Sequence, residues 1–207
     1  MKESRTKQSI IDAAITLFNT KGYAGTSVRD IAGRAKVNAA NISYYFTNKQ
    51  GLLEYIVTQF LDGYIRVLEQ VLAQHLTSPK ETMLLTVRAL LRYQSENRYL
   101  TRFFYREISL DSVLNRELVP LYLSRERQYF QVLLRTGMES GEFHKVSFSV
   151  FMVQLKAMLQ APYLHTQYIS EVLYTIPSDP LFLGGYAKEV EKWLEHTLFR
   201  TAGLVPS

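Results

Sequence analysis

The stretch of residues 26–49 limits the possible folds of this chain most, because it predicts two short helices joined by a tight turn. Ser27 and Asp30 have the spacing of a capping box, which predicts that the first helix begins there. Asn38 is a good N-cap for a second helix over residues 39–46. Two helices joined by a turn of about three or four residues form the helix-turn-helix plan, whose second helix enters the DNA major groove.

The positive charge of the chain is concentrated at its N-terminal end. The full chain of 207 residues carries a formal net charge of +5. Residues 1–51 hold eight Lys and Arg against three Asp and Glu, whereas the rest of the chain holds sixteen of each. Because nucleic acid is a polyanion, this location favours DNA binding over ordinary solubilising charge.

The remaining segments have helical periodicity, and none has the clear alternation of a strand, so the predicted fold class is all-α. We expect a helix-turn-helix DNA-binding domain over residues 1–48 and a helical regulatory and dimerisation domain over residues 49–207. Besides the two short helices, we expect helices near residues 4–20, 49–76, 79–96, 100–110, 112–140, 146–164, 167–174 and 186–201.

Three strings in the first 55 residues resemble the TetR family of bacterial transcriptional regulators. They are GYAGTSVRDIA at residues 22–32, VNAANISYYF at residues 37–46 and NKQGLL at residues 48–53. The resemblance implies a three-helix N-terminal domain and a C-terminal helical bundle that dimerises. Ser43 and Tyr45 replace a Tyr and a His that are common in the family, so we expect the base contacts to differ while the docking is kept.

The resemblance places the second short helix in the major groove, where alanine methyls and hydroxyls can meet base edges. Asn41 either binds adenine or serves the start of the helix. Thr26 and Ser27 either grip the groove wall or only cap their helix, while Lys49 suits a phosphate beside a helix N-terminus. The candidate DNA-binding residues are Thr26, Ser27, Arg29, Asn38, Ala39, Ala40, Asn41, Ser43, Tyr44, Tyr45 and Lys49.

The segment 146–164 is apolar on nearly all faces, and the last helix is also rich in large apolar residues. A helix that is apolar all round must be covered on both sides. A second copy of the chain can cover one side, as the TetR resemblance implies; the alternative is a wholly internal helix. The candidate dimer-interface residues are Phe151, Leu155, Met158, Leu159, Val190, Trp193 and Leu194.

Six arginines lie within 29 residues, interleaved with aromatic residues: Arg88, Arg92, Arg98, Arg102, Arg106 and Arg116. They form either a surface for an acidic protein partner or solvated side chains, some of them paired internally. The strings NISYYF, LTRFFYRE and PYLHTQYISEVLY resemble TetR-type DNA binders of spore-forming bacilli that restrain the division protein FtsZ during sporulation. That resemblance implies FtsZ as a partner, with Arg102, Arg106, Arg116 and Glu117 as the candidate partner surface.

Catalysis is poorly supported by the sequence. The four histidines are scattered, and neither a metal-ligand spacing nor a phosphate-binding glycine loop is present, so we expect no catalytic residue, metal or cofactor. An enzyme or ligand carrier is the weakest alternative; a ligand-responsive repressor with a small-molecule pocket in the C-terminal domain is the stronger one, with its effector unknown.

The absence of cysteine and of an apolar N-terminal segment agrees with a cytoplasmic location, and the expected DNA binding adds association with the nucleoid. Polar residues interrupt the segment 146–164, so we expect no membrane span. The expected partners are therefore double-stranded DNA with a two-fold symmetric site, a second copy of the chain, and FtsZ.

Overall fold

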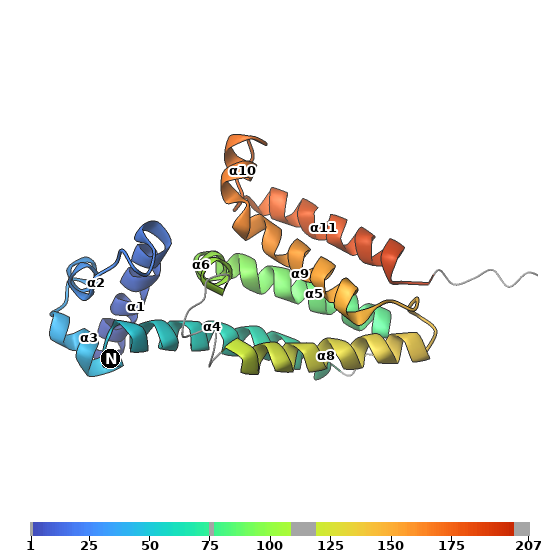
Figure 1. Cartoon of the computed structure of the whole chain (residues 1–207), viewed down its shortest axis with the longest axis horizontal. Helices are drawn as coiled ribbons and strands as arrows, with labels where there is room; N and C mark the ends of the chain where they lie inside the picture. The colour runs from blue at the N-terminus through green and yellow to red at the C-terminus, as the bar shows by residue number, and fades with distance from the viewer. Residues whose placement is uncertain (1, 75–76, 109–118, 201–207) are drawn as a thin grey trace, which may run out of the picture. The chain divides into compact units, whose positions relative to one another are not determined.

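The computed structural model describes residues 2–74, 77–108 and 119–200, and the all-α prediction is confirmed (Figure 1). Within these ranges the only extended pairing is an isolated bridge between Phe143 and Phe199. The helices are α1 (Lys2–Lys21), α2 (Val28–Ala35), α3 (Ala39–Phe46), α4 (Lys49–Leu72), α5 (Pro79–Glu96), α6 (Arg98–Ile108), α8 (Val119–Glu139), α9 (Phe148–Leu164), α10 (Thr166–Glu171) and α11 (Pro180–Thr197).

The start of the last helix differs from the sequence prediction. We expected it near residue 186, because two consecutive glycines precede that position. Instead α11 begins at Pro180, and the Asp179 side chain accepts a hydrogen bond from the Leu181 amide. Proline at the first helical position and aspartate before it are strong start signals, and they outweigh the helix-weakening effect of Gly184 and Gly185.

The helices group into two compact units. Of the described residues, the first unit holds those up to Asp62 together with residues 97–108, and the second holds the others. The predicted domain boundary between residues 48 and 49 coincides with the start of α4. The first part of α4 and the whole of α6 nevertheless belong with the helix-turn-helix.

The core of the first unit is built on one face of α1. Ile10, Ala14 and Phe18 are spaced four residues apart and are fully buried, as an amphipathic helix requires. The Phe18 ring stacks on Phe103 of α6, with 5.5 Å between the ring centroids. The Asn19 amide nitrogen also donates to the Tyr99 carbonyl oxygen at 2.9 Å. Helix α6 is therefore fixed to the C-terminal end of α1.

The second unit is a helical bundle with a buried polar cluster in its core. Large apolar side chains from the rest of α4 and from α5, α8, α9 and α11 fill it. Glu126 of α8 is only 5% exposed, and its carboxylate accepts hydrogen bonds from the Tyr64 hydroxyl at 2.6 Å and from the Lys156 ammonium at 2.8 Å. Three helices, α4, α8 and α9, thus share one buried charge that is fully hydrogen-bonded.

Candidate nucleic-acid interface

The start of α2 has the predicted capping box. The Ser27 hydroxyl oxygen accepts from the Asp30 amide at 3.1 Å, and the Asp30 carboxylate accepts from the Ser27 amide at 2.9 Å. The Ser27 hydroxyl also donates to the Asp30 carboxylate at 2.6 Å, and the bonds that this carboxylate accepts from the Ser27 hydroxyl and amide lower the pKa of Asp30 to about 2. The helix ends at Lys36, which adopts a left-handed conformation with φ of 56° and closes the turn into α3.

Helix α3 is held by two buried side chains and presents small and hydroxyl groups to solvent. Asn38 caps it as predicted, because its side-chain oxygen accepts from the Ala40 amide at 2.9 Å. Ile42 and Phe46 are four residues apart and buried, so they fix the inner face of the helix. Ser43 and Tyr44 lie on the outer side, and Tyr44 is 74% exposed.

The junction between α3 and α4 is tight. Thr47 has φ of 68° and ψ of −53°, and the Asn48 amide donates to the Phe46 carbonyl at 2.7 Å, which is a γ-turn of the strained type. The Asn48 side chain then accepts from the Gly51 amide at 2.9 Å. This turn, which leaves little freedom between the two helices, was not predicted because no composition signal marks it.

Lys49, a candidate phosphate ligand, is engaged within the chain. Its ammonium donates to the Thr26 carbonyl at 2.8 Å and to the Tyr23 carbonyl at 3.0 Å, and it lies 4.2 Å from the centroid of the Tyr23 ring. Two of its three donors are therefore used within the chain. Lys49 ties the start of α4 to the segment between α1 and α2, and its third donor has no hydrogen bond within the described residues.

Thr26 is 1% exposed, and its hydroxyl donates to the Gly22 carbonyl at 2.8 Å. Its side chain therefore serves the turn before α2 and not the groove wall. The other candidates lie at the surface and differ in how exposed they are. Ser27, Arg29, Asn38, Ala40, Ser43 and Tyr44 are exposed, whereas Ala39, Asn41, Tyr45 and Lys49 are half-buried.

Arg5, Arg34 and Lys36 of the first unit are also exposed cations, and they were not among the candidates. Their signal in the sequence was only the general basic charge of the N-terminal region. The Tyr45 hydroxyl donates to the Glu3 carbonyl oxygen at 3.4 Å, and desolvation and the nearby Glu3 carboxylate raise its pKa. The side chains of Arg5, Arg34 and Lys36 are donors suited to phosphate oxygens.

The arginine region divides into paired and exposed side chains. Arg106 donates to the Phe18 carbonyl at 2.8 Å, so it holds the end of α1 and is not a free surface group. Arg88 makes two hydrogen bonds to Glu191, at 2.6 and 2.7 Å. Arg102 is exposed. Arg116 and Glu117 lie outside the described residues.

The predicted dimer-interface residues lie mostly inside a single chain. Phe151, Leu155, Leu159, Val190 and Leu194 are buried in the core of the second unit, and Met158 and Trp193 are half-buried. The chain itself covers most of these side chains, and a helix that is apolar all round does not reveal in its sequence which half the chain covers. The exposed side of α9 carries Val150, Val153, Ala157 and Leu164.

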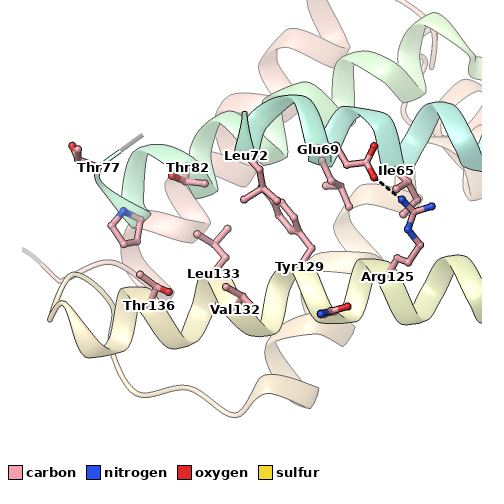
Figure 2. A pocket seen from close by; sticks show the side chains of 13 residues that line it. Ile65, Glu69, Leu72, Thr77, Thr82, Arg125, Tyr129, Val132, Leu133 and Thr136 are labelled. Atoms are coloured by element: carbon pink, nitrogen blue, oxygen red, sulfur yellow. Dashed lines mark hydrogen bonds and ion pairs between the residues drawn. The ribbon is translucent and has the colours of Figure 1, made fainter. Parts of the chain in front are cut away.

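The second unit has a pocket of about 400 Å³ between α4, the start of α5 and α8 (Figure 2). Leu72, Val132 and Leu133 contribute apolar walls, and Thr82 and Thr136 contribute hydroxyl groups. An ion pair between Arg125 and Glu69 stands at one end of the pocket, and both side chains are about half exposed.

Over the described residues, no group of three His, Cys, Asp or Glu side chains is arranged to hold a metal ion. A search of the same residues finds no helix that is both long enough and apolar enough to cross a membrane.

Comparisons with known proteins agree with the geometry of the first unit. The family model for bacterial regulatory proteins of the tetR family matches residues 10–56. Over 197 residues the chain is 45% identical to the probable HTH-type transcriptional regulator YttP of Bacillus subtilis strain 168, and the alignment covers 95% of each chain.

Two solved structures are similar over nearly the whole chain. The TetR family transcriptional regulator PfmR of Thermus thermophilus is 25% identical, with a TM-score of 0.74, covering 92% of this chain and 99% of that one. The ketosteroid transcriptional regulator KstR2 of Mycobacterium tuberculosis is 16% identical and shares the fold, with a TM-score of 0.76, covering 94% and 95% of the two chains.

Proposed function

Because the chain belongs to the TetR family of bacterial regulatory proteins, it is a DNA-binding transcriptional regulator and not an enzyme, and we propose that its helix α3 contacts the bases of a two-fold symmetric operator. The observation that carries this proposal is the division of α3 into two faces. Ile42 and Phe46 anchor the inner face, and the outer face exposes Ser43 and Tyr44, whose hydroxyls can reach base edges.

The groups around α3 have separate roles in this proposal. Ala39 and Ala40 approach the bases closely, and their methyl groups suit thymine methyls. Arg29, Tyr45 and the remaining donor of Lys49 bind phosphate oxygens. The Asn38 side-chain oxygen is used by the cap, so only its amide nitrogen is left for the DNA backbone.

Binding to cognate and random duplexes at several salt concentrations tests these roles. Ser43→Ala and Tyr44→Ala are expected to weaken cognate binding by roughly 1–3 kcal/mol and to relax preference at particular base pairs. Arg29→Ala is expected to weaken binding to all duplexes and to reduce the salt slope by about one. Arg135→Ala, on the exposed side of α8, is the matched control and should change neither. Equal losses on both duplexes for all variants contradict the proposed roles.

TetR regulators bind DNA as homodimers. We place the interface of this chain on the exposed side of α9, where Val150, Val153, Ala157 and Leu164 follow one another at helical spacing. Two copies of α3 on a two-fold axis then meet half-sites about 34–36 Å apart. Val153→Glu, at a side chain that is 70% exposed, should give folded monomers with much weaker operator binding. A dimer that survives this change contradicts the placement.

A finer part of the proposal concerns a protein partner. The strings NISYYF, LTRFFYRE and PYLHTQYISEVLY resemble RefZ-type regulators, and we propose that this chain likewise couples DNA binding to inhibition of FtsZ-dependent division during sporulation. Exposed Arg102 supports the proposal, because an unburied guanidinium suits an acidic protein surface. Arg102→Glu should abolish the effect on FtsZ assembly while operator affinity stays unchanged. Unchanged inhibition by this variant contradicts the partner role.

The pocket between α4, α5 and α8 supports a second candidate function, that of a ligand-responsive repressor. Its apolar walls and the partly exposed Arg125 suit a small amphipathic carboxylate, which can compete with Glu69 for the guanidinium. A series of aliphatic carboxylates should then weaken operator binding by the wild type but not by Val132→Trp, which fills the pocket. An equal response, or none in either protein, contradicts this function.

A further inference from the structure

The segment of residues 166–181, which we call the arm, exposes an unusual amount of apolar surface. It comprises α10 and the chain that leads to the start of α11, and Ile169 is the only residue of α10 that is buried. Six large apolar side chains of the arm are between 51% and 89% exposed: Tyr168, Val172, Leu173, Tyr174, Ile176 and Leu181. Contiguous exposed apolar surface of this kind marks an interaction site in most soluble proteins.

The arm has a defined backbone conformation without any partner. The Thr175 amide donates to the Ile169 carbonyl at 3.0 Å, and the Leu173 amide donates to the Tyr168 carbonyl at 3.2 Å. Between them Tyr174 adopts the left-handed conformation, with φ of 51°. Glycine is the usual residue after a helix in that conformation, because a Cβ atom makes it unfavourable.

The backbone conformation of Tyr174 is therefore unfavourable, and its side chain packs little against its own chain, since it is 89% exposed. A large aromatic group at such a position is explained by a contact outside the chain. Tyrosine is enriched in protein interfaces, where its ring buries apolar area and its hydroxyl keeps a polar partner.

The charge of the arm decides which class of partner fits. It contains Glu171 and Asp179 and neither Lys nor Arg. A surface with two acids and no base is unsuited to DNA and to anionic lipid, both of which attract basic residues. The partner is therefore an apolar protein surface.

The neighbouring surface of the same unit bears on which protein covers the arm. Val150, Val153, Ala157 and Leu164 form one exposed stripe on α9, and α10 follows at its C-terminal end (Figure 1). Leu181 lies in the first turn of α11, where Gly184 and Gly185 are also exposed and a Cβ atom on either would meet no other atom within 4 Å. The arm thus continues the exposed side of α9 that we have proposed as the dimer interface, and small residues at its far end let a second chain approach closely.

We propose that the arm packs against a second copy of this chain and extends the dimer interface from α9 through Tyr168, Leu173 and Tyr174. This inference rests on the proposed homodimer. In a two-fold symmetric dimer the same surface is used by both copies, so each arm is covered once by its partner and the apolar area it buries counts twice.

The absence of cysteine from the chain makes a direct test possible. Leu173→Cys and Tyr174→Cys each introduce a single thiol, and the rate of its modification by a maleimide is compared in the dimer and in the Val153→Glu monomer. We expect modification at least about tenfold slower in the dimer, because a packed interface excludes the reagent. Arg135→Cys, on the exposed side of α8, is the control and should react at the same rate in both backgrounds.

Tyr174→Gly gives an independent test, because it should stabilise the monomer and weaken the dimer. Glycine relieves the left-handed backbone, so the variant should raise the melting temperature of the Val153→Glu monomer. In the otherwise wild-type chain it should raise the dissociation constant of the dimer by roughly tenfold or more, because an anchoring aromatic is lost.

The outcomes separate the arm from the dimer itself. If Val153→Glu dissociates the dimer while the arm thiols react equally fast in both backgrounds and Tyr174→Gly leaves the dissociation constant unchanged, the arm proposal is wrong and the dimer proposal stands. A wild-type chain that sediments as a monomer at micromolar concentration overturns both.

Discussion

Gly51 lies so close to Phe46 that a Cβ atom on it would stand 2.2 Å from the Phe46 carbonyl oxygen. This contact follows directly from the γ-turn at Thr47, which brings the end of α3 against the first turn of α4. The orientation of α3 therefore depends on the absence of a side chain at residue 51.

Gly51→Ala should displace α3 and lower the free energy of unfolding by about 1–3 kcal/mol, because backbone must move to relieve the overlap. Operator affinity should fall as well. Gly33→Ala is the matched control: a Cβ atom there meets nothing within 4 Å, and alanine in a helix should stabilise the chain by about 0.5–1 kcal/mol. Denaturant titration measures both, and a neutral Gly51→Ala contradicts the tight junction.

Lys49→Ala should weaken DNA binding and also destabilise the fold. The ammonium makes two charge-assisted hydrogen bonds to the carbonyls of Tyr23 and Thr26, and a bond of this kind is typically worth about 1.5–3 kcal/mol. Lys36→Ala removes an exposed cation and should weaken DNA binding with little change in melting temperature. If Lys49→Ala melts like the wild type, its role is limited to phosphate contact.

Substitution of Arg106 should lower the stability of the fold, whereas substitution of Arg102 should not. Arg106→Ala leaves the Phe18 carbonyl without its guanidinium donor and should cost about 1–3 kcal/mol of stability. Arg102→Ala should stay within about 0.5 kcal/mol of the wild type, as is usual for exposed side chains. Thermal melts of the two variants check this, and equal stabilities would refute the assignment of Arg106 to the fold.

Lys156→Met should destabilise the second unit strongly. The substitution removes the ammonium partner of the buried Glu126 carboxylate, which keeps only the hydrogen bond from Tyr64. Breaking a buried ion pair typically costs about 3–5 kcal/mol. The double variant Glu126→Gln with Lys156→Met removes both charges and should recover much of that loss. Denaturant titration of the wild type, Lys156→Met, Glu126→Gln and the double variant measures the coupling, and strictly additive effects contradict it.

The capping box of α2 makes stability depend on pH in the acid range. The pKa of Asp30 is lowered from its ordinary value of 3.8 to about 2 in the folded chain, chiefly by hydrogen bonds from Ser27. Its contribution is therefore present above pH 3.8 and is lost as the pH falls toward 2. Asp30→Ala should remove that part of the acid loss, as followed by melting temperature against pH. An unchanged profile would assign the loss to other carboxylates.

Local features of the site were predictable from the sequence, whereas long-range ones were not. The caps at Ser27 and Asn38 involve residues two or three positions apart, so spacing alone specifies them. The bonds of Lys49 and Arg106 join segments 23 to 88 residues apart, and their acceptors are backbone carbonyls that carry no sequence signal. For the same reason these two cations were assigned to surfaces when the chain itself uses them.

Helical periodicity was enough to predict the fold class, but it did not show which side of each helix is buried. Leu155 and Leu159 of α9 are apolar and buried, and Val153 is equally apolar and 70% exposed. Periodicity distinguishes a polar from an apolar side, and α9 has no clearly polar side to make that distinction. The residues available to a second copy could be identified only from the packing of the second unit.

The most direct test of base recognition by α3 is selection of bound duplexes from a random pool, carried out with the wild type and with Tyr44→Ala. We expect an inverted repeat whose half-sites lie about one helical turn, roughly 34–36 Å, apart. We also expect Tyr44→Ala to enrich a repeat with relaxed preference at the same positions in each half-site. Enrichment of no sequence by the wild type, or of an identical repeat by both proteins, would contradict base recognition by the exposed face of α3.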